Sequence, residues 1–176
     1  MTVVRSLLIC VCAFLFHLPL QAEPLNVLVG EITFSRPEEW KWELPVSKTT
    51  ALVRFVIPSP PGRPALTDVR FFLGTKNPAA AAALWKSYFP ETKEGGDIHE
   101  EKAQIAGYNF TYLTLHGTYV FPGSKGKRDQ TLIGIVIPSG KQYVQVRLLG
   151  PTDEVKAATG RFRKMIENAL REKAAE

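Results

Sequence analysis

The sequence predicts an α+β domain in which two main helices pack on a mostly antiparallel sheet of about six strands. Short β-branched and aromatic segments follow one another through connections that are too brief for parallel crossovers. Two other segments, at 77–89 and 152–170, repeat their apolar residues every three or four positions, as helices do. The chain has 176 residues, 45% of them hydrophobic and 22% charged, which suits one domain that is neither disordered nor fibrous.

The first 22 residues predict a secretory signal peptide, which leaves 23–176 as a single α+β domain. Arg5 precedes the almost wholly apolar run Leu7–Leu20, and the small Ala22 stands at the expected cleavage point. A basic start, a short apolar stretch and a small residue before the cut are typical of such leaders. The sequence therefore predicts a protein outside the cytoplasm, periplasmic or secreted, with no membrane span after cleavage.

Both cysteines, Cys10 and Cys12, lie inside this expected leader. The mature chain then has no cysteine, which excludes disulfides, zinc–thiolate sites and cysteine nucleophiles together. Its stability has to come from a packed core.

Strands are expected wherever apolar residues alternate with polar ones or run continuously between turn residues. Trp40 and Trp42 share one side of a short strand, and the nearly continuous apolar run of 131–137 predicts a strand that is covered on both faces. The segment 91–102 predicts an exposed acidic connection. The expected strands are Val27–Phe34, Trp40–Leu44, Ala51–Ile57, Asp68–Leu73, Tyr108–Leu115, Thr131–Ile137 and Gln142–Leu149.

Each expected helix has a recognisable start. Asn77 and Pro78 suit the cap and the first position of a helix that ends before Pro90. Thr152 is the expected cap of the second helix, whose apolar face is predicted to continue to the end of the chain.

Several aromatic, glycine and proline motifs occur in order along the chain: ITFSRPEEWKWELPVSKTTALVRFVIP (32–58), FFLG (71–74), LWKSYFP (84–90), GTY (117–119), LIGIVIP (132–138) and VRLLGPTDEV (146–155). With these motifs the chain resembles an uncharacterised family of secreted bacterial proteins, whose fold is similar to the PsbP-like α-β-α sandwich. PsbP is a non-catalytic extrinsic subunit of photosystem II. The resemblance implies a fold, an extracytoplasmic setting and binding or accessory work, and fold alone does not fix function.

Three arginines occupy comparable positions on three different expected strands. If these strands are neighbours in matching register, the arginines form a cationic, aromatic-edged surface that can hold a carboxylate or phosphate. In the alternative, each arginine lies at the rim of the sheet or pairs with an acid. The candidate ligand-binding residues are Arg54, Arg70, Tyr112, His116 and Arg147, with Tyr143 and Gln145 near them.

No catalytic residue, metal ligand or cofactor is predicted. His99 and the two glutamates after it begin like a zinc-binding helix, but Ala103 stands where the second histidine would be. His116 is a lone imidazole, and no serine or cysteine nucleophile lies in a recognisable turn.

The leading functional hypothesis is therefore a secreted, non-catalytic binding or accessory module whose ligand the sequence does not name. An alternative is a hydrolase or ligand-processing enzyme with a site near His116 and Arg147. A third is a basic module that adheres to an anionic envelope polymer through Lys125, Lys127 and Arg128. The expected partner is a protein or such a polymer. Nucleic acid is not expected, because a net charge of +5 is too mild to favour it.

Overall fold

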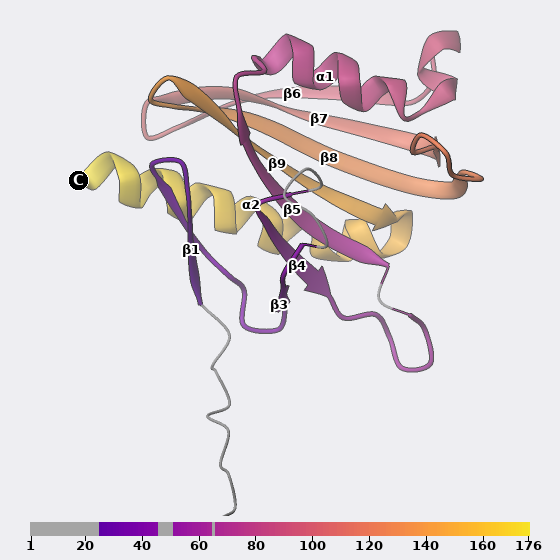
Figure 1. Cartoon of the computed structure of the whole chain (residues 1–176), viewed down its shortest axis with the longest axis horizontal. Coiled ribbons are helices and arrows are strands. Elements are labelled where there is room, and N and C mark those ends of the chain that lie inside the picture. Colours follow the sequence, from indigo (N-terminus) through magenta and orange to yellow (C-terminus); the bar gives the residue numbers. More distant parts are fainter. Residues whose placement is uncertain (1–24, 46–50, 65) are drawn as a thin grey trace, which may run out of the picture.

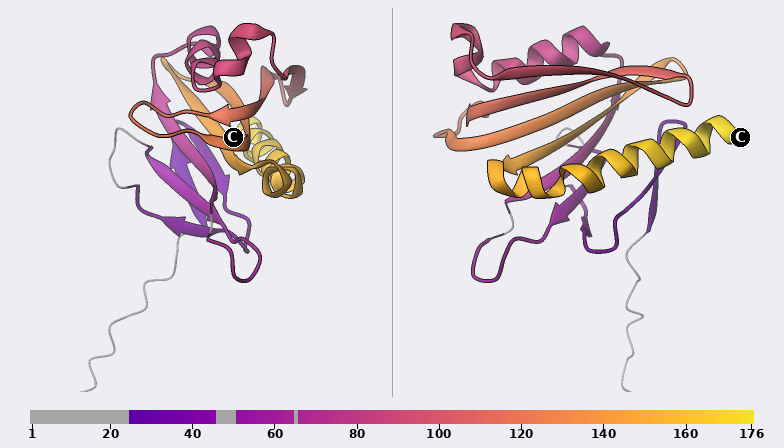
Figure 2. Two further views of the ribbon diagram at one scale, coloured as in Figure 1. Left: turned by 90° about the vertical axis from the view of Figure 1, so that its right-hand side faces the viewer. Right: turned by 180° about the vertical axis from the view of Figure 1, so that it is seen from behind.

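The computed structural model describes residues 25–45, 51–64 and 66–176. The expected leader and its two cysteines lie outside these residues. In the described part of the chain, two helices lie on opposite faces of one large sheet, which Figures 1 and 2 show from three sides. None of the helices in this part is long and apolar enough to cross a membrane.

The strands are β1 (Asn26–Val29), β2 (Ile32–Ser35), β3 (Lys41–Glu43), β4 (Val53–Ile57), β5 (Thr67–Gly74), β6 (Ile98–Ile105), β7 (Tyr108–Tyr119), β8 (Lys127–Ser139) and β9 (Gln142–Pro151). The helices are α1 (Pro78–Ser87), the short 3₁₀ helix η1 (Pro90–Glu94) and α2 (Thr152–Ala175).

Seven strands form the large sheet in the order β3-β4-β5-β9-β8-β7-β6, and every neighbouring pair is antiparallel. Strands β1 and β2 form a separate hairpin. The predicted α+β class with a mostly antiparallel sheet is confirmed. Strand β8 lies in the interior of the sheet, as its continuous apolar run predicts, and its residues 131–137 are all buried.

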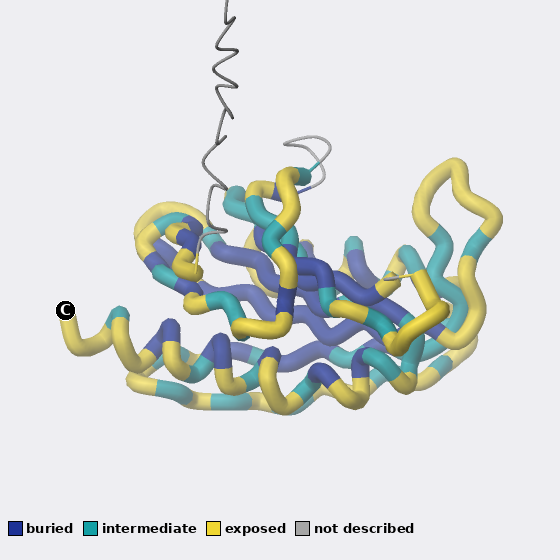
Figure 3. The backbone as a smooth tube through the Cα atoms, turned by 90° about the horizontal axis from the view of Figure 1, so that it is seen from below, coloured by how far each residue is buried: buried dark blue, intermediate teal, exposed yellow. Residues whose placement is uncertain are grey.

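One face of the sheet packs against α2 and the β1–β2 hairpin. The ring of Phe71 on β5 lies 4.9 Å from that of Phe34 on β2 and 5.2 Å from that of Phe55 on β4. Figure 3 shows buried residues along the middle of the sheet and on the side of α2 that faces it. The buried residues of α2 are those that the helical period predicts: Val155, Ala158, Phe162, Met165, Ile166, Ala169 and Leu170.

The opposite face packs against α1. The side chain of Asn77 accepts a hydrogen bond from the amide of Ala80 (2.9 Å), and Pro78 is the first helical residue, so the predicted helix start is confirmed. Trp85 is buried and lies directly over Gly134 of β8, where an added Cβ would come within 2.3 Å of the indole Cζ3. The missing side chain lets α1 approach the sheet closely.

Two predicted elements differ in the structure. The single strand expected at 27–34 is a hairpin, because Gly30 adopts a φ of +62° and allows the chain to reverse there. The exposed connection expected at 91–102 contains η1 and the start of β6. Strand β6 is an edge strand, so charged residues such as Glu100 and Glu101 hide the alternation that a buried strand would display.

Candidate ligand-binding site

A row of three arginines crosses one face of the sheet. Arg54 on β4 pairs directly with Arg70 on β5, which in turn pairs with Arg147 on β9. Directly paired residues point to the same side of a sheet. The next residue in the row is Gly134 of β8, which lies under Trp85. The three arginines therefore share the face that α1 covers.

Two of these arginines share one carboxylate. Asp68 lies two residues before Arg70 on β5 and is only 4% exposed. Its Oδ2 accepts hydrogen bonds from Arg54 Nε at 2.9 Å and from Arg70 Nη2 at 2.8 Å. Arg54 also donates through Nη1 to Glu43 of β3 at 2.7 Å. The paired alternative considered for the arginines thus holds for these two.

Arg147 is different, because it is buried and has no acidic partner among the residues that the structure describes. The residue is 6% exposed, its Nε has no hydrogen-bond partner, and it forms no ion pair with any described residue. Its Cζ lies 4.9 Å from the centre of the Phe72 ring, a cation–π contact. Burial lowers the pKa of the guanidinium, but an arginine keeps its charge at neutral pH. The guanidinium therefore carries a buried positive charge that no carboxylate of the described residues contacts directly.

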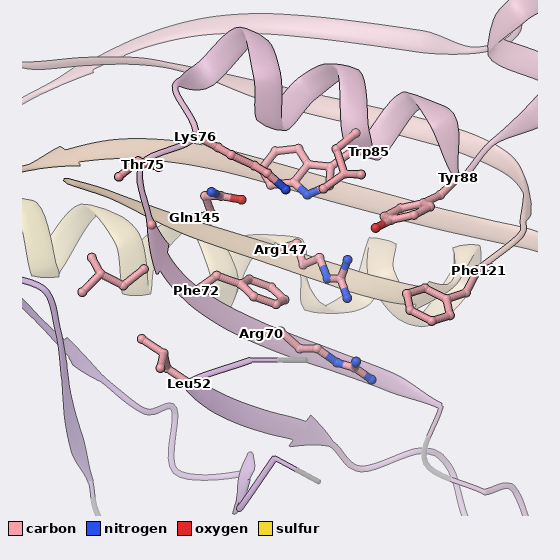
Figure 4. Close-up of a pocket in the computed structure, with 13 residues that line it drawn as sticks. Leu52, Arg70, Phe72, Thr75, Lys76, Trp85, Tyr88, Phe121, Gln145 and Arg147 are labelled. Atoms are coloured by element: carbon pink, nitrogen blue, oxygen red, sulfur yellow. The ribbon is translucent and has the colours of Figure 1, made fainter. Parts of the chain in front are cut away.

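The guanidinium opens into a cavity of about 720 Å³ between α1 and the sheet, here termed the α1 pocket. Figure 4 shows Arg147 projecting into this space. Its polar lining is Arg70, Thr75, Lys76, Gln145 and Arg147. Its apolar lining is Leu52, Phe72, Leu73, Leu84, Trp85, Tyr88 and Phe121. No acidic residue is among the described residues that line it.

The two ends of the α1 pocket differ. In Figure 4, Lys76 and Gln145 lie at one end, while Tyr88 and Phe121 lie at the other, beyond Arg147. Phe121 comes from the connection between β7 and β8, and its ring packs 5.9 Å from that of Tyr88. Phe121 is nevertheless 46% exposed, and Leu52 is 44% exposed. The pocket therefore has a buried cationic centre and partly open apolar margins.

Two of the predicted ligand-binding residues lie on the opposite face of the sheet. Tyr112 on β7 faces α2, where the Arg163 guanidinium lies 4.3 Å from the centre of its ring. His116 also faces α2. Its Nδ1 lies 3.2 Å from the Thr131 hydroxyl and 3.0 Å from that of Thr152. The predicted surface is therefore corrected, because the sheet separates these residues from the arginines.

This placement bears on two further expectations. An enzyme site shared by His116 and Arg147 does not form, because the two side chains point to opposite faces of the sheet. Thr152 does not cap α2 either. The cap position is Pro151, and the Thr152 hydroxyl is within hydrogen-bond distance of His116 instead. This contact joins the first residue of α2 to β7 of the sheet.

No family model matches the sequence, and no curated protein is similar to it. Solved structures are similar to it in fold, and three of them are described here. The cyanobacterial PsbP (CyanoP) of Synechocystis has a TM-score of 0.50 and 10% identity, covering 77% of this chain and 83% of that one. The fold is PsbP-like.

The other two structures have lower TM-scores. LpqN of Mycobacterium tuberculosis, involved in cell envelope biogenesis, has a TM-score of 0.46 and 21% identity over 78% of this chain and 80% of its own. PA94 of Pseudomonas aeruginosa, a protein of unknown function, has a TM-score of 0.46 and 12% identity over 81% and 92%. At such identities a likeness concerns the fold and transfers no activity.

On the PsbP-like scaffold, the basic residues singled out by the sequence lie at one hairpin tip. Lys125 is in the connection between β7 and β8, and Lys127 and Arg128 begin β8. All three are exposed, and none lines the α1 pocket. The tip thus borders the pocket only through Phe121, and adhesion to an anionic polymer stays a prediction.

The sequence reasoning missed most of the aromatic lining. Phe72 lies two residues from Arg70 on β5, so strand alternation places both on one face of the sheet. This two-residue spacing is the sequence signal that predicts the place of Phe72 in the pocket. Trp85 is both buried and part of the pocket wall.

Because Tyr112 is buried, we expect the protein to lose stability in alkali. Burial raises the pKa of its hydroxyl to about 12, against about 10 in an unfolded chain. As the pH rises, the tyrosine loses its proton in the unfolded chain before it does so in the folded one. The stability that the protonated Tyr112 hydroxyl contributes is therefore intact below pH 10 and is lost as the pH rises towards 12. We expect the free energy of unfolding to fall by about 2 kcal/mol over that range.

Urea unfolding at pH 9 and pH 11 measures this change in the wild type and in Tyr112→Phe. The variant should lose less stability between the two values. Burial also raises the pKa of Tyr119, which leaves a smaller slope in the variant. Equal losses in both proteins would contradict the assignment.

Proposed function

We propose that this protein is a secreted, non-catalytic binding or accessory module, and that the α1 pocket holds the anionic group of its ligand. The observation that carries the proposal is Arg147, a buried guanidinium that forms no ion pair with an acidic residue in the part of the chain that the structure describes. A buried charge is costly to a fold unless it is paired. A bound anion would supply the missing partner.

The remaining features of the pocket support a ligand of small-molecule size. A volume of about 720 Å³ lies within the usual range for such sites, as does a mostly apolar lining with a few polar groups. Arg147 can donate through its two terminal nitrogens to a carboxylate or a phosphate, which matches the fork geometry of a guanidinium. Gln145, next to Arg147 on the same face of β9, adds an amide that can donate as well.

Arg147→Met tests whether the arginine serves binding or the fold. Methionine fills a similar space without a charge, so we expect the free energy of unfolding to stay equal or rise by about 1 kcal/mol. Thermal shift and calorimetric titration with acetate, inorganic phosphate, benzoate and decanoate should detect binding of at least one anion to the wild type. The variant should lose it.

The exposed Lys125→Met is the matched control, since it also removes one positive charge but lies outside the pocket. It should retain the response to the anion. A marked loss of stability in Arg147→Met would indicate a structural role for the charge, and silence of the wild type towards every anion would refute the proposed site.

The extracytoplasmic setting rests on the leader that the sequence predicts. We expect the protein isolated from its native cells to begin at or within a few residues of Glu23. Intact-mass spectrometry of the protein from the envelope or the medium measures this directly. A chain found in the cytoplasm with residues 1–22 still attached would refute it.

A further inference from the structure

We infer that the ligand of the α1 pocket is an amphiphilic anion, with a single carboxylate or phosphate head at Arg147 and an apolar body along the aromatic wall. This inference rests on the proposed function and specifies its ligand class.

The charge balance of the pocket favours a single negative charge. Arg70 points into the pocket, but Asp68 takes up its charge through hydrogen bonds of 2.8 Å and 3.1 Å. Lys76 is exposed, so water already solvates its ammonium group. Arg147 is thus the buried cation without a partner among the described lining residues. One anionic group suffices to compensate it.

The aromatic walls around Arg147 favour a ligand that has an apolar part as well as an anionic group. Phe72 lies against one side of the guanidinium, and Trp85 and Tyr88 line the α1 side of the same space. An acetate or phosphate ion would occupy a small part of about 720 Å³ and would leave these rings in contact with water. An apolar body that covers them would gain hydrophobic stabilisation that a bare ion does not.

The margins of the pocket also favour a ligand with an apolar part. Leu52 and Phe121 are among the few large hydrophobic side chains that are more than 40% exposed, and both line the pocket. The ring of Phe121 also packs on that of Tyr88. A ligand with an aliphatic or aromatic body would cover both residues on binding.

Titration of the full chain with four probes separates the contributions of head and body. The probes are acetate, decanoate, decyl phosphate and the neutral decanol, each below the concentration at which it aggregates and followed by tryptophan fluorescence and calorimetry. Burying three or four CH₂ groups raises affinity about 100-fold. We therefore expect decanoate or decyl phosphate to bind at least 100-fold more tightly than acetate and at least tenfold more tightly than decanol.

Whichever of the two head groups binds more tightly is the one that Arg147 selects. Arg147→Met should bring the affinity for the anionic chains down to that for decanol. Phe121→Ser should weaken their binding at least threefold without unfolding the protein, because the ring is partly exposed. Leu28→Ser, which changes an exposed residue of β1 that does not line the pocket, should leave binding unchanged.

Equal binding of acetate and decanoate would overturn the inference that the ligand is amphiphilic. The anion site of the proposed function would remain. Equal binding of decanol and decanoate would also overturn the inference, because the head group would not be recognised. Failure of every anion, acetate included, would refute the proposed function itself.

Discussion

We expect Gly134→Ala to lower the free energy of unfolding by about 2–3 kcal/mol. The new Cβ would lie 2.3 Å from Cζ3 and 2.5 Å from Cε3 of the buried Trp85 indole, which is far inside van der Waals contact. Gly134 lies in the interior strand β8, so its backbone is held by partners on both sides. The indole or the whole of α1 has to move outward, which loosens the packing of that face.

Gly160→Ala is the matched control for this prediction. Gly160 lies inside α2, and an added Cβ there has no atom within 4 Å. The same substitution should therefore raise the free energy of unfolding by about 0.5–1 kcal/mol, since alanine is the better helix former. Urea unfolding followed by circular dichroism measures both changes.

The Trp85→Leu background identifies the cause. If the indole is what the new methyl group meets, Gly134→Ala should cost at least 1 kcal/mol less in that background than in the wild type. An equal cost in both backgrounds would show that strain in the strand itself is responsible. Trp85 also lines the α1 pocket, so Gly134→Ala should weaken ligand binding as well.

Local patterns in the sequence predict much of this fold. The apolar period of α2 identifies its buried face, and Asn77 with Pro78 identifies the start of α1. Both signals act within one or two helical turns, where side-chain geometry is fixed by the backbone. Pro138 and Gly140 are likewise typical turn residues, and the strands that meet there, β8 and β9, form a hairpin.

The candidate site depends on contacts that are remote in sequence. The comparable positions of Arg54, Arg70 and Arg147 were visible, but their alignment is a property of strand register, and a shift of one residue would move any of them to the other face. For the same reason Tyr112 and His116 were grouped with the wrong face. The pairing of β7 with β8 places them towards α2.

Replacing Asp68 should destabilise the protein strongly. Asp68→Asn keeps the shape of the side chain but removes the charge that Arg54 and Arg70 share. Because Asp68 is 4% exposed, the two guanidinium groups lose a partner that water cannot easily replace. Breaking a buried pair in this way lowers the free energy of unfolding by about 3 kcal/mol.

Glu43→Gln provides the control, because Glu43 also pairs with Arg54 but its side chain is 47% exposed. Exposed pairs contribute little, so this change should cost less than about 1 kcal/mol. Urea unfolding of the two variants compares them directly. Equal costs would mean that Asp68 acts as an ordinary surface acid, which would contradict its central place between the arginines.

The Asp68→Asn variant also connects the fold with the proposed binding site. Once Asp68 no longer takes up the charge of Arg70, that arginine faces the α1 pocket beside Arg147 as a second available cation. We therefore expect decanoate to raise the melting temperature of Asp68→Asn more than that of the wild type or Glu43→Gln, because tighter binding to the native state adds more stability. The same increment in all three proteins would show that Arg70 does not reach the ligand. A larger increase in the melting temperature of Asp68→Asn would mean that Asp68 both stabilises the sheet and leaves the pocket with one available positive charge.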